Sequence, residues 1–156
     1  MIEYKKATEE NIDDIIDLRI IYLIEYNTFL EDDVISILRK NMKEYLIKHL
    51  NQDCFIYVAY DKEKIASSVI VNIFEKVPSP RFMNGKYGEM YGVYTRVEYR
   101  KRGIASELVK QMIHEMSNKE ISFIQLGASE DGKSIYEKNG FQYTSSEYVE
   151  MKYYYD

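Results

Sequence analysis

A turn of three basic residues and a glycine, residues 100–103, separates two segments of different character. Residues 89–95 before it are rich in aromatic and β-branched side chains, which favour a strand. Residues 104–116 after it repeat apolar side chains at helical spacing. The first N–H groups of a helix have no partner within the helix, and the helix dipole adds positive charge there. A strand, a basic turn and a helix start together predict a phosphate-binding cradle.

Main-chain groups would hold most of an anion bound in this cradle. Gly103 has no Cβ, so its backbone can approach a bulky anion closely. The residues predicted to bind phosphate are Arg100, Lys101, Arg102, Gly103, Ile104, Ala105 and Ser106. A solvated basic turn with an ordinary turn glycine is the alternative interpretation, and only the combination of features favours a diphosphate site.

The composition restricts the protein to a few broad classes. The 156 residues suit one domain, 1–156, with one sizeable core. The single cysteine, Cys54, excludes an internal disulfide framework, and its apolar strand predicts a buried thiol rather than a nucleophile. No apolar run could span a bilayer and no signal-peptide pattern is visible, so we expect a cytoplasmic protein with no membrane partner. A net charge of −5 argues against nucleic acid as a partner.

Periodicity and turn residues predict the order β-α-α-β-β-β-α-β-α-β-β, an α+β fold with a mixed sheet. The predicted strands cover residues 2–6, 54–60, 65–74, 89–97 and 121–126, with two more within 141–155. The predicted helices cover residues 8–26, a segment that begins near residue 32, and residues 103–117 and 133–138. The longest loop, residues 75–88, carries both prolines.

A second motif competes for the role of phosphate site. Residues 127–134 match G-x-x-x-x-G-K-[ST], the P-loop pattern, and lie between a predicted strand and a predicted helix. Too few residues follow for another strand–helix–strand unit that could supply a magnesium-binding carboxylate. Glu130 and Asp131 would also repel a triphosphate. A nucleotide-binding P-loop therefore ranks below the basic turn, and a helix-capping loop is the simpler interpretation.

Residues 100–105 have the pattern Arg100-x-x-Gly103-x-Ala105. This pattern is similar to the Arg/Gln-x-x-Gly-x-Gly/Ala motif of the GCN5-related N-acetyltransferases, the GNAT family, and the chain resembles that family. Residues 93–95 before the motif and residues 136–141 after it resemble the family's neighbouring elements in the right order. The resemblance covers nearly the whole chain and implies a fold whose central strands splay apart to admit coenzyme A.

The resemblance implies roles for residues on the acetyl-donor side. Val93 and Thr95 would offer main-chain groups to the pantetheine arm, although both also fit an ordinary core strand. Tyr136 takes the position of the tyrosine that the family often uses as a general acid. A phenol with a pKa of about 10 is protonated at neutral pH and could give its proton to a departing thiolate. The alternative interpretation of Tyr136 is an ordinary packing side chain on a short helix.

Three further residues are candidates for the site: Glu89, Ser129 and Ser134. Glu89 lies near the start of the central strand, where some family members carry a catalytic carboxylate, and it equally fits an exposed charge at a strand end. Glu89 is the candidate for the general base that deprotonates the amine, and water is the alternative. Gly127 stands where many relatives have a polar residue, which puts Ser129 and Ser134 forward as replacement ligands.

The function that follows is transfer of the acetyl group of acetyl-coenzyme A to a primary amine of a small molecule or peptide, by direct attack. The acceptor is expected between the first two helices and the 75–88 loop, where acidic and aromatic residues would suit a cationic amine: Tyr22, Glu25, Tyr26 and Glu31. A coenzyme A-binding regulatory module without catalysis is the alternative, and a P-loop nucleotide-binding protein is the third hypothesis.

Two further expectations concern metals and self-association. His49 and His114 have no second His or Cys at metal-ligand spacing, so we expect no metal. Tyr153, Tyr154 and Tyr155 are expected on an edge strand, where a homodimer contact is one interpretation.

Overall fold

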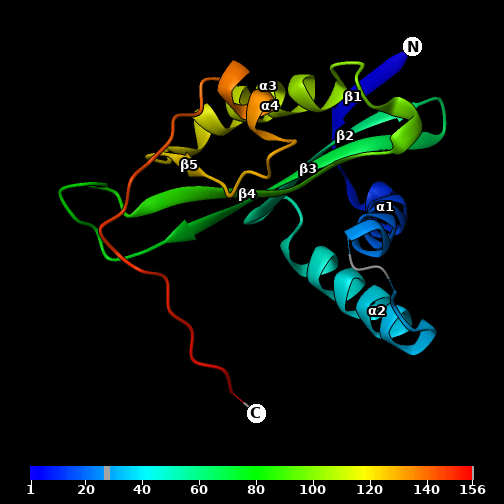
Figure 1. The fold of residues 1–156 in the computed structure, drawn as a ribbon, viewed down its shortest axis with the longest axis horizontal. Helices are drawn as coiled ribbons and strands as arrows, with labels where there is room; N and C mark the ends of the chain where they lie inside the picture. The colour runs from blue at the N-terminus through cyan, green and yellow to red at the C-terminus, as the bar shows by residue number, and fades with distance from the viewer. Residues whose placement is uncertain (27–28, 156) are drawn as a thin grey trace.

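Five strands form one mixed sheet in the computed structural model, which describes residues 1–26 and 29–155 (Figure 1). In chain order the strands are β1 (Ile2–Lys6), β2 (Cys54–Asp61), β3 (Lys64–Glu75), β4 (Lys86–Thr95) and β5 (Ile124–Gln125). They lie side by side in the same order; neighbouring strands from β1 to β4 are antiparallel, and β5 runs parallel to β4. The predicted mixed sheet and fold class are confirmed.

Helices cover both faces of the sheet. The four α-helices of the described ranges are α1 (Ile12–Tyr26), α2 (Asp32–His49), α3 (Ile104–Met116) and α4 (Lys133–Lys138). Short 3-10 turns cover Glu9–Asn11, Val97–Tyr99 and Ser117–Lys119. Figure 1 shows α1 and α2 on one side of the sheet and α3 with α4 on the other. In the described part of the chain, no helix combines the length and the apolar composition needed to cross a membrane.

The core has two halves, one on each face of the sheet. Ile56 and Val58 of β2 pack in the half that contains α1 and α2, whereas Phe55 and Tyr57 pack in the half that contains α3. Alternate residues of a strand point to opposite faces, so both sets are buried when both faces are covered. Residues 54–60 of β2 are accordingly all buried.

A β-bulge interrupts β4 in the middle of the sheet. Ile70 pairs with Tyr91 and Ser68 pairs with Tyr94. Two residues of β4, Gly92 and Val93, therefore lie opposite one residue of β3, Val69. Gly92 adopts a left-handed backbone with φ of +60°, which glycine tolerates without strain. A bulge leaves backbone groups unpaired and bends its strand.

The predicted strand 121–126 is shorter than expected. Its ladder with β4 joins only Gly88 to Ile124 and Glu89 to Gln125. From residue 90 onward, no strand in the described ranges pairs with this outer edge of β4. The two parallel strands thus part beside the bulge, as the family resemblance implied.

The prediction of two final strands within 141–155 is wrong for the structure. Residues 141–155 contain no strand, and the C-terminal tail leaves the body of the molecule (Figure 1). Its large side chains are exposed, with Tyr148 and Tyr153 at 79% and 82%. An alternating pattern favours a strand only where a neighbour offers a matching edge, and the two-residue β5 offers a very short one.

Candidate active site

The start of α3 is an uncapped helix N-terminus. Gly103 precedes the helix with φ of +76°, and no side chain caps it. The first helical bond runs from the N–H of Glu107 to the carbonyl of Gly103 at 3.1 Å. The N–H groups of Ile104, Ala105 and Ser106 therefore have no acceptor within the helix. A Cβ built on Gly103 meets no heavy atom within 4 Å, so the turn is open above its backbone.

The three basic side chains of the turn do not act as one group. Arg100 donates to both carboxylate oxygens of Glu25 at 2.7 and 2.9 Å, and to the carbonyl of Thr95 at 3.0 Å. Arg102 lies over the ring of Tyr99 at 5.5 Å. Arg100 is thus a tie between α1 and the turn, while Lys101 and Arg102 remain as cations beside the helix start.

Glu25 is the acidic partner that joins α1 to β4. Tyr94 donates to Glu25 at 2.6 Å, and this bond, followed by those from Arg100, holds the pKa of the Glu25 carboxyl below its usual range. Burial, followed by the hydrogen bond to Glu25 and the charge of Glu25, raises the pKa of Tyr94 to about 12. Its place in the sequence suggested that Glu25 could bind a cationic acceptor. Because Glu25 is already paired with Arg100 and Tyr94, its carboxylate is not free for that role.

The two β4 residues expected at the pantetheine arm differ in their surroundings. Val93 lies in the bulge on the free edge of the strand. The hydroxyl of Thr95 lies 2.8 Å from the hydroxyl of Ser67, and the Thr95 carbonyl already accepts from Arg100. Main-chain groups at the bulge are therefore more open to a ligand than those at Thr95.

Tyr136 lies on α4 with its ring against Phe141, at 5.9 Å between ring centroids. The side chain is half-buried, and no residue of the described ranges accepts a hydrogen bond from its hydroxyl. Burial, followed by the nearby Tyr22 and Tyr26 phenols, raises the pKa of Tyr136. The hydroxyl therefore stays protonated at neutral pH.

Asn139 fixes α4 against the start of α3, a contact that the sequence did not reveal. Its amide donates to the hydroxyl of Ser106 at 3.0 Å and to the carbonyl of Ile135 at 2.8 Å. The contact brings the helix that carries Tyr136 next to the first turn of α3. The structure thereby brings together two segments that the sequence predicts for the site, the helix with Tyr136 and the start of α3.

The loop before α4 contains the P-loop match. Lys133 pairs with Glu130 at 2.7 Å inside the loop, so its ammonium group already has a counter-ion. The N–H of Gly132 donates to the hydroxyl of Ser129 at 3.2 Å, which makes Ser129 a turn-forming residue. A Cβ on Gly132 would lie 3.1 Å from the Tyr136 ring, so this turn lies against Tyr136. Ser134 is exposed at the first turn of α4.

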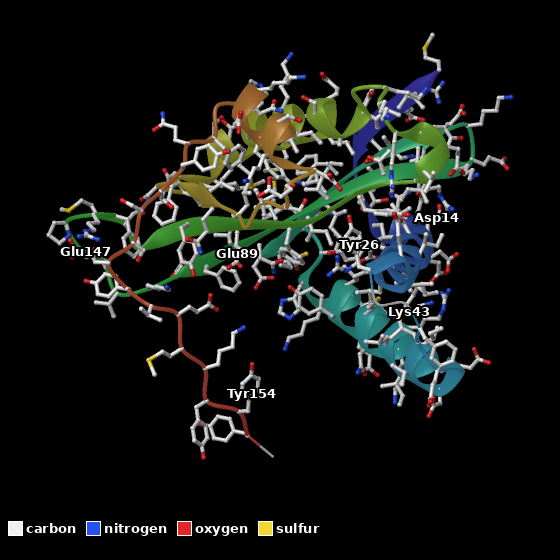
Figure 2. The ribbon with its side chains drawn as sticks, viewed as in Figure 1. Asp14, Tyr26, Lys43, Glu89, Glu147 and Tyr154 are labelled. Atoms are coloured by element: carbon white, nitrogen blue, oxygen red, sulfur yellow. The ribbon has the colours of Figure 1, made fainter. Side chains whose placement is uncertain are left out.

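Polar side chains also meet on the face of the sheet that α1 and α2 cover. The amide of Asn72 donates to the Tyr45 hydroxyl and accepts from the Tyr91 hydroxyl, both at 2.6 Å. Glu89 is exposed, pairs across the sheet with Asn72, and shares its face with Tyr91 two residues along β4 (Figure 2). The structure thus places Glu89 beside this group and on the opposite face from Met90.

Cys54 lies beside the same polar group and is buried. Only 1% of the residue is exposed, and burial raises the pKa of the thiol to about 11. A thiolate nucleophile needs a lowered pKa and access to solvent. The prediction of a buried thiol is confirmed, and Cys54 does not suit covalent catalysis.

The sequence of the chain matches the profile described as "Acetyltransferase (GNAT) domain" over residues 3–144. The protein belongs to the GNAT family. No curated protein sequence matches this GNAT protein.

Solved structures share the GNAT fold at low sequence identity. A predicted acetyltransferase with acetyl-CoA from Clostridium acetobutylicum is 24% identical, with a TM-score of 0.80 and coverage of 97% of this chain and 96% of that chain. A GCN5-related N-acetyltransferase from Ralstonia eutropha JMP134 is 18% identical, with a TM-score of 0.78 and coverage of 97% and 99%. Glucosamine-6-phosphate N-acetyltransferase from Arabidopsis thaliana is 19% identical, with a TM-score of 0.72 and coverage of 100% and 99%.

Proposed function

We propose that this GNAT protein transfers the acetyl group of acetyl-coenzyme A to a primary amine of a small molecule or peptide. The proposal is supported by three features that come together in the fold. They are the uncapped start of α3, the bulge on the edge of β4 beyond its ladder with β5, and the Tyr136 hydroxyl on α4, the helix that Asn139 ties to the start of α3. They supply an anion site, unpaired main-chain groups and a proton donor.

The donor site is suited to a long ligand with a diphosphate at one end. The N–H groups of residues 104–106 and the cations of Lys101 and Arg102 would bind the diphosphate. Gly103 keeps this surface free of a Cβ. The edge of β4 near Val93 would bind the amide-containing arm as an added strand does. Acetyl-coenzyme A supplies the thioester from which the acetyl group leaves.

Residues of the chain would then position the reacting groups and hold one proton. The unpaired main-chain groups of the bulge can donate to an oxygen that gains negative charge during attack, which is a stabilising contribution. The Tyr136 hydroxyl, protonated at neutral pH, would give its proton to the departing sulfur. No protein nucleophile is required, because the amine attacks directly.

The amine must lose its proton before or during the attack. Glu89 is the carboxylate on the acceptor face of β4, and we assign it as the proton acceptor, either directly or through water. The regulatory alternative, coenzyme A binding without transfer, would have no use for a free Tyr136 hydroxyl.

Two measurements test the proposal. Calorimetry should show that the purified protein binds coenzyme A, and a thiol assay over a panel of primary amines should show amine-dependent release of coenzyme A. Binding without release for every amine would favour the regulatory module. Absence of coenzyme A binding would contradict both the acetyltransferase and the regulatory module.

A further inference from the structure

A cavity of about 200 Å³ lies between α1, α2 and the sheet, on the acceptor side of β4. Aliphatic side chains line most of it, among them Met42, Leu46, Ile56 and Ile70. Arg19 is the charged side chain among the residues that line it. An apolar cavity with a single charge is typical of a site that recognises an amphipathic small molecule.

Arg19 has no acidic partner in residues 1–26 and 29–155. Its guanidinium lies over the rings of Tyr22 at 5.0 Å and Tyr91 at 5.7 Å. No carboxylate among the residues that the structure describes lies within ion-pair distance, whereas Arg39 and Arg100 are both paired. A half-buried charge without a counter-ion is costly, and the two aromatic rings offset only part of that cost. The free hydrogen-bond donors of Arg19 are thus suited to an anionic ligand.

The guanidinium lies directly against the bulge of β4. A Cβ built on Gly92 would lie 2.8 Å from Nη1 of Arg19, and only glycine leaves room for both. Gly92 is next to Val93, where the acetyl donor is proposed to bind. Tyr22 continues the contact, because its ring packs on Tyr94 at 5.7 Å between centroids. A ligand held by Arg19 would therefore lie next to the reacting end of the donor.

We propose that Arg19 binds the carboxylate of the acceptor, and that the acceptor is an amino acid with an apolar side chain. The carboxylate would pair with the guanidinium, the side chain would enter the aliphatic part of the cavity, and the amine would lie at the bulge. This inference rests on the proposed acetyl transfer. It replaces the cationic acceptor that Glu25 suggested, because Glu25 is paired with Arg100 and Tyr94.

A carboxylate fits this site better than a phosphate. One guanidinium binds a planar carboxylate through two parallel hydrogen bonds. A phosphate dianion would need further cations, and no other residue lining the cavity carries a charge. The hydroxyls of Tyr45 and Tyr91 are already engaged with Asn72, so they shape the polar end of the cavity and do not add charge.

The test compares matched acceptors with the wild-type protein and three variants. Leucine, leucinamide and 3-methylbutylamine share one apolar side chain and differ in the group next to the amine, and glucosamine 6-phosphate supplies the phosphate comparison. The variants are Arg19→Gln, Arg19→Lys and the control Arg39→Gln. Arg39 is an exposed arginine of α2 that pairs with Asp17 at 2.6 Å and does not line the cavity.

The wild type should favour leucine in kcat/KM over both analogues that lack the carboxylate. Arg19→Gln should reduce kcat/KM for leucine by about 10- to 100-fold, the loss of a charged hydrogen-bond pair, and leave kcat/KM for these two analogues nearly unchanged. The kcat/KM of Arg19→Lys for leucine should lie between the values for the wild type and Arg19→Gln, because lysine keeps the charge without the paired donors. Arg39→Gln should keep the wild-type preference, and calorimetry should give every variant the wild-type affinity for coenzyme A.

The possible failures are distinguishable. Equal use of leucine and 3-methylbutylamine, an unchanged preference in Arg19→Gln, or a preference for glucosamine 6-phosphate would overturn the carboxylate site and leave the proposed acetyl transfer intact. Coenzyme A binding with no acetylation of any amine would contradict the proposed activity itself.

Discussion

In the proposed function, the donor side and the acceptor side of β4 recognise their ligands with different parts of the chain. On the donor side, main-chain groups at the start of α3 and in the β4 bulge provide most of the predicted contacts. On the acceptor side, the proposed contacts come from the Arg19 guanidinium and from aliphatic side chains such as Leu46 and Ile70, which are far apart in the sequence. The first kind of site leaves a short motif, whereas the second depends on how the helices pack.

This difference has a consequence for mutation. A main-chain site is sensitive to what is added to it, because a new side chain fills space that the ligand needs. A side-chain site is sensitive to what is removed. Variants of each kind should therefore affect one ligand and leave the other unchanged, which makes the comparison testable.

The largest effect is expected from Gly103→Glu on the donor side. The new carboxylate would lie at the helix start, occupy the space of the diphosphate and repel it, so coenzyme A affinity should fall by about 100-fold or more. Calorimetry measures the loss. Gly140→Glu is a matched control, because Gly140 also has a positive φ, of +89°, and open space above its backbone. Wild-type coenzyme A affinity in Gly103→Glu would mean that the cradle lies elsewhere.

The next effect concerns the proton of Tyr136. Tyr136→Phe keeps the ring against Phe141 and removes only the hydroxyl, so the chemical step should slow by roughly 100-fold or more while coenzyme A affinity stays unchanged. Single-turnover kinetics with a working amine measures the step. Because the pKa of Tyr136 is raised, loss of its proton should not lower the wild-type rate between about pH 7 and pH 9.

A control for that variant is available on the same side of the molecule. Tyr143 is an exposed tyrosine whose hydroxyl donates to Glu137, and Tyr143→Phe should leave the chemical step unchanged. An unaltered step in Tyr136→Phe would assign the proton to water or to another hydroxyl, such as Ser129 or Ser134.

A smaller effect, on the free energy of unfolding, is expected at the contact between α1 and the turn before α3. Glu25→Gln removes the charge that pairs with Arg100, and a pair with this exposure should contribute about 0.5–1 kcal/mol to the free energy of unfolding. The pKa of Glu25 is lowered in the folded state, so this contribution is present above the unfolded pKa of about 4.3 and is lost as the pH falls through the folded value. Urea unfolding at pH 7 and pH 3 measures it. An equal difference at both pH values would show that the charge of Glu25 is not the cause.

The smallest effect is expected in the loop that matches the P-loop pattern. Lys133 is paired with Glu130, so Lys133→Ala and Ser134→Ala should not change any ATP affinity, because we expect none in the wild type. Fluorescence titration with ATP and Mg²⁺ checks this. Micromolar, magnesium-dependent binding by the wild type would place a nucleotide site in the loop after all.

The sequence carries a clearer signal for the proposed donor side than for the proposed acceptor side, for physical reasons. A phosphate cradle needs a glycine, nearby cations and a helix start within a few residues, so the segment around Gly103 carries its own signal. The ends of β2 and β3 were predicted within one residue, because strands buried on both faces read as long apolar runs. Arg19 had no such signal, since an arginine on a helix is usually solvated and only packing reveals that it lacks a partner.

The features that the sequence could not reveal have equally specific causes. Arg100 remains a predicted phosphate ligand by its place in the motif, but its pairing with Glu25 across the fold could not be read from the sequence. The aromatic residues after Phe141 alternate like a strand, yet strand formation depends on an edge that the short β5 barely provides. Local patterns thus predicted local structure, and contacts between distant segments required the fold.

The most direct test of the proposed activity follows an isotopic label in the acetyl group of acetyl-coenzyme A. The wild-type protein is incubated with the labelled donor and leucine, and mass spectrometry then locates the label. Direct attack predicts labelled N-acetylleucine in a 1:1 ratio with free coenzyme A, and an unlabelled protein. Label on the protein would contradict direct attack, and release of coenzyme A without a labelled amine would contradict amine acetylation.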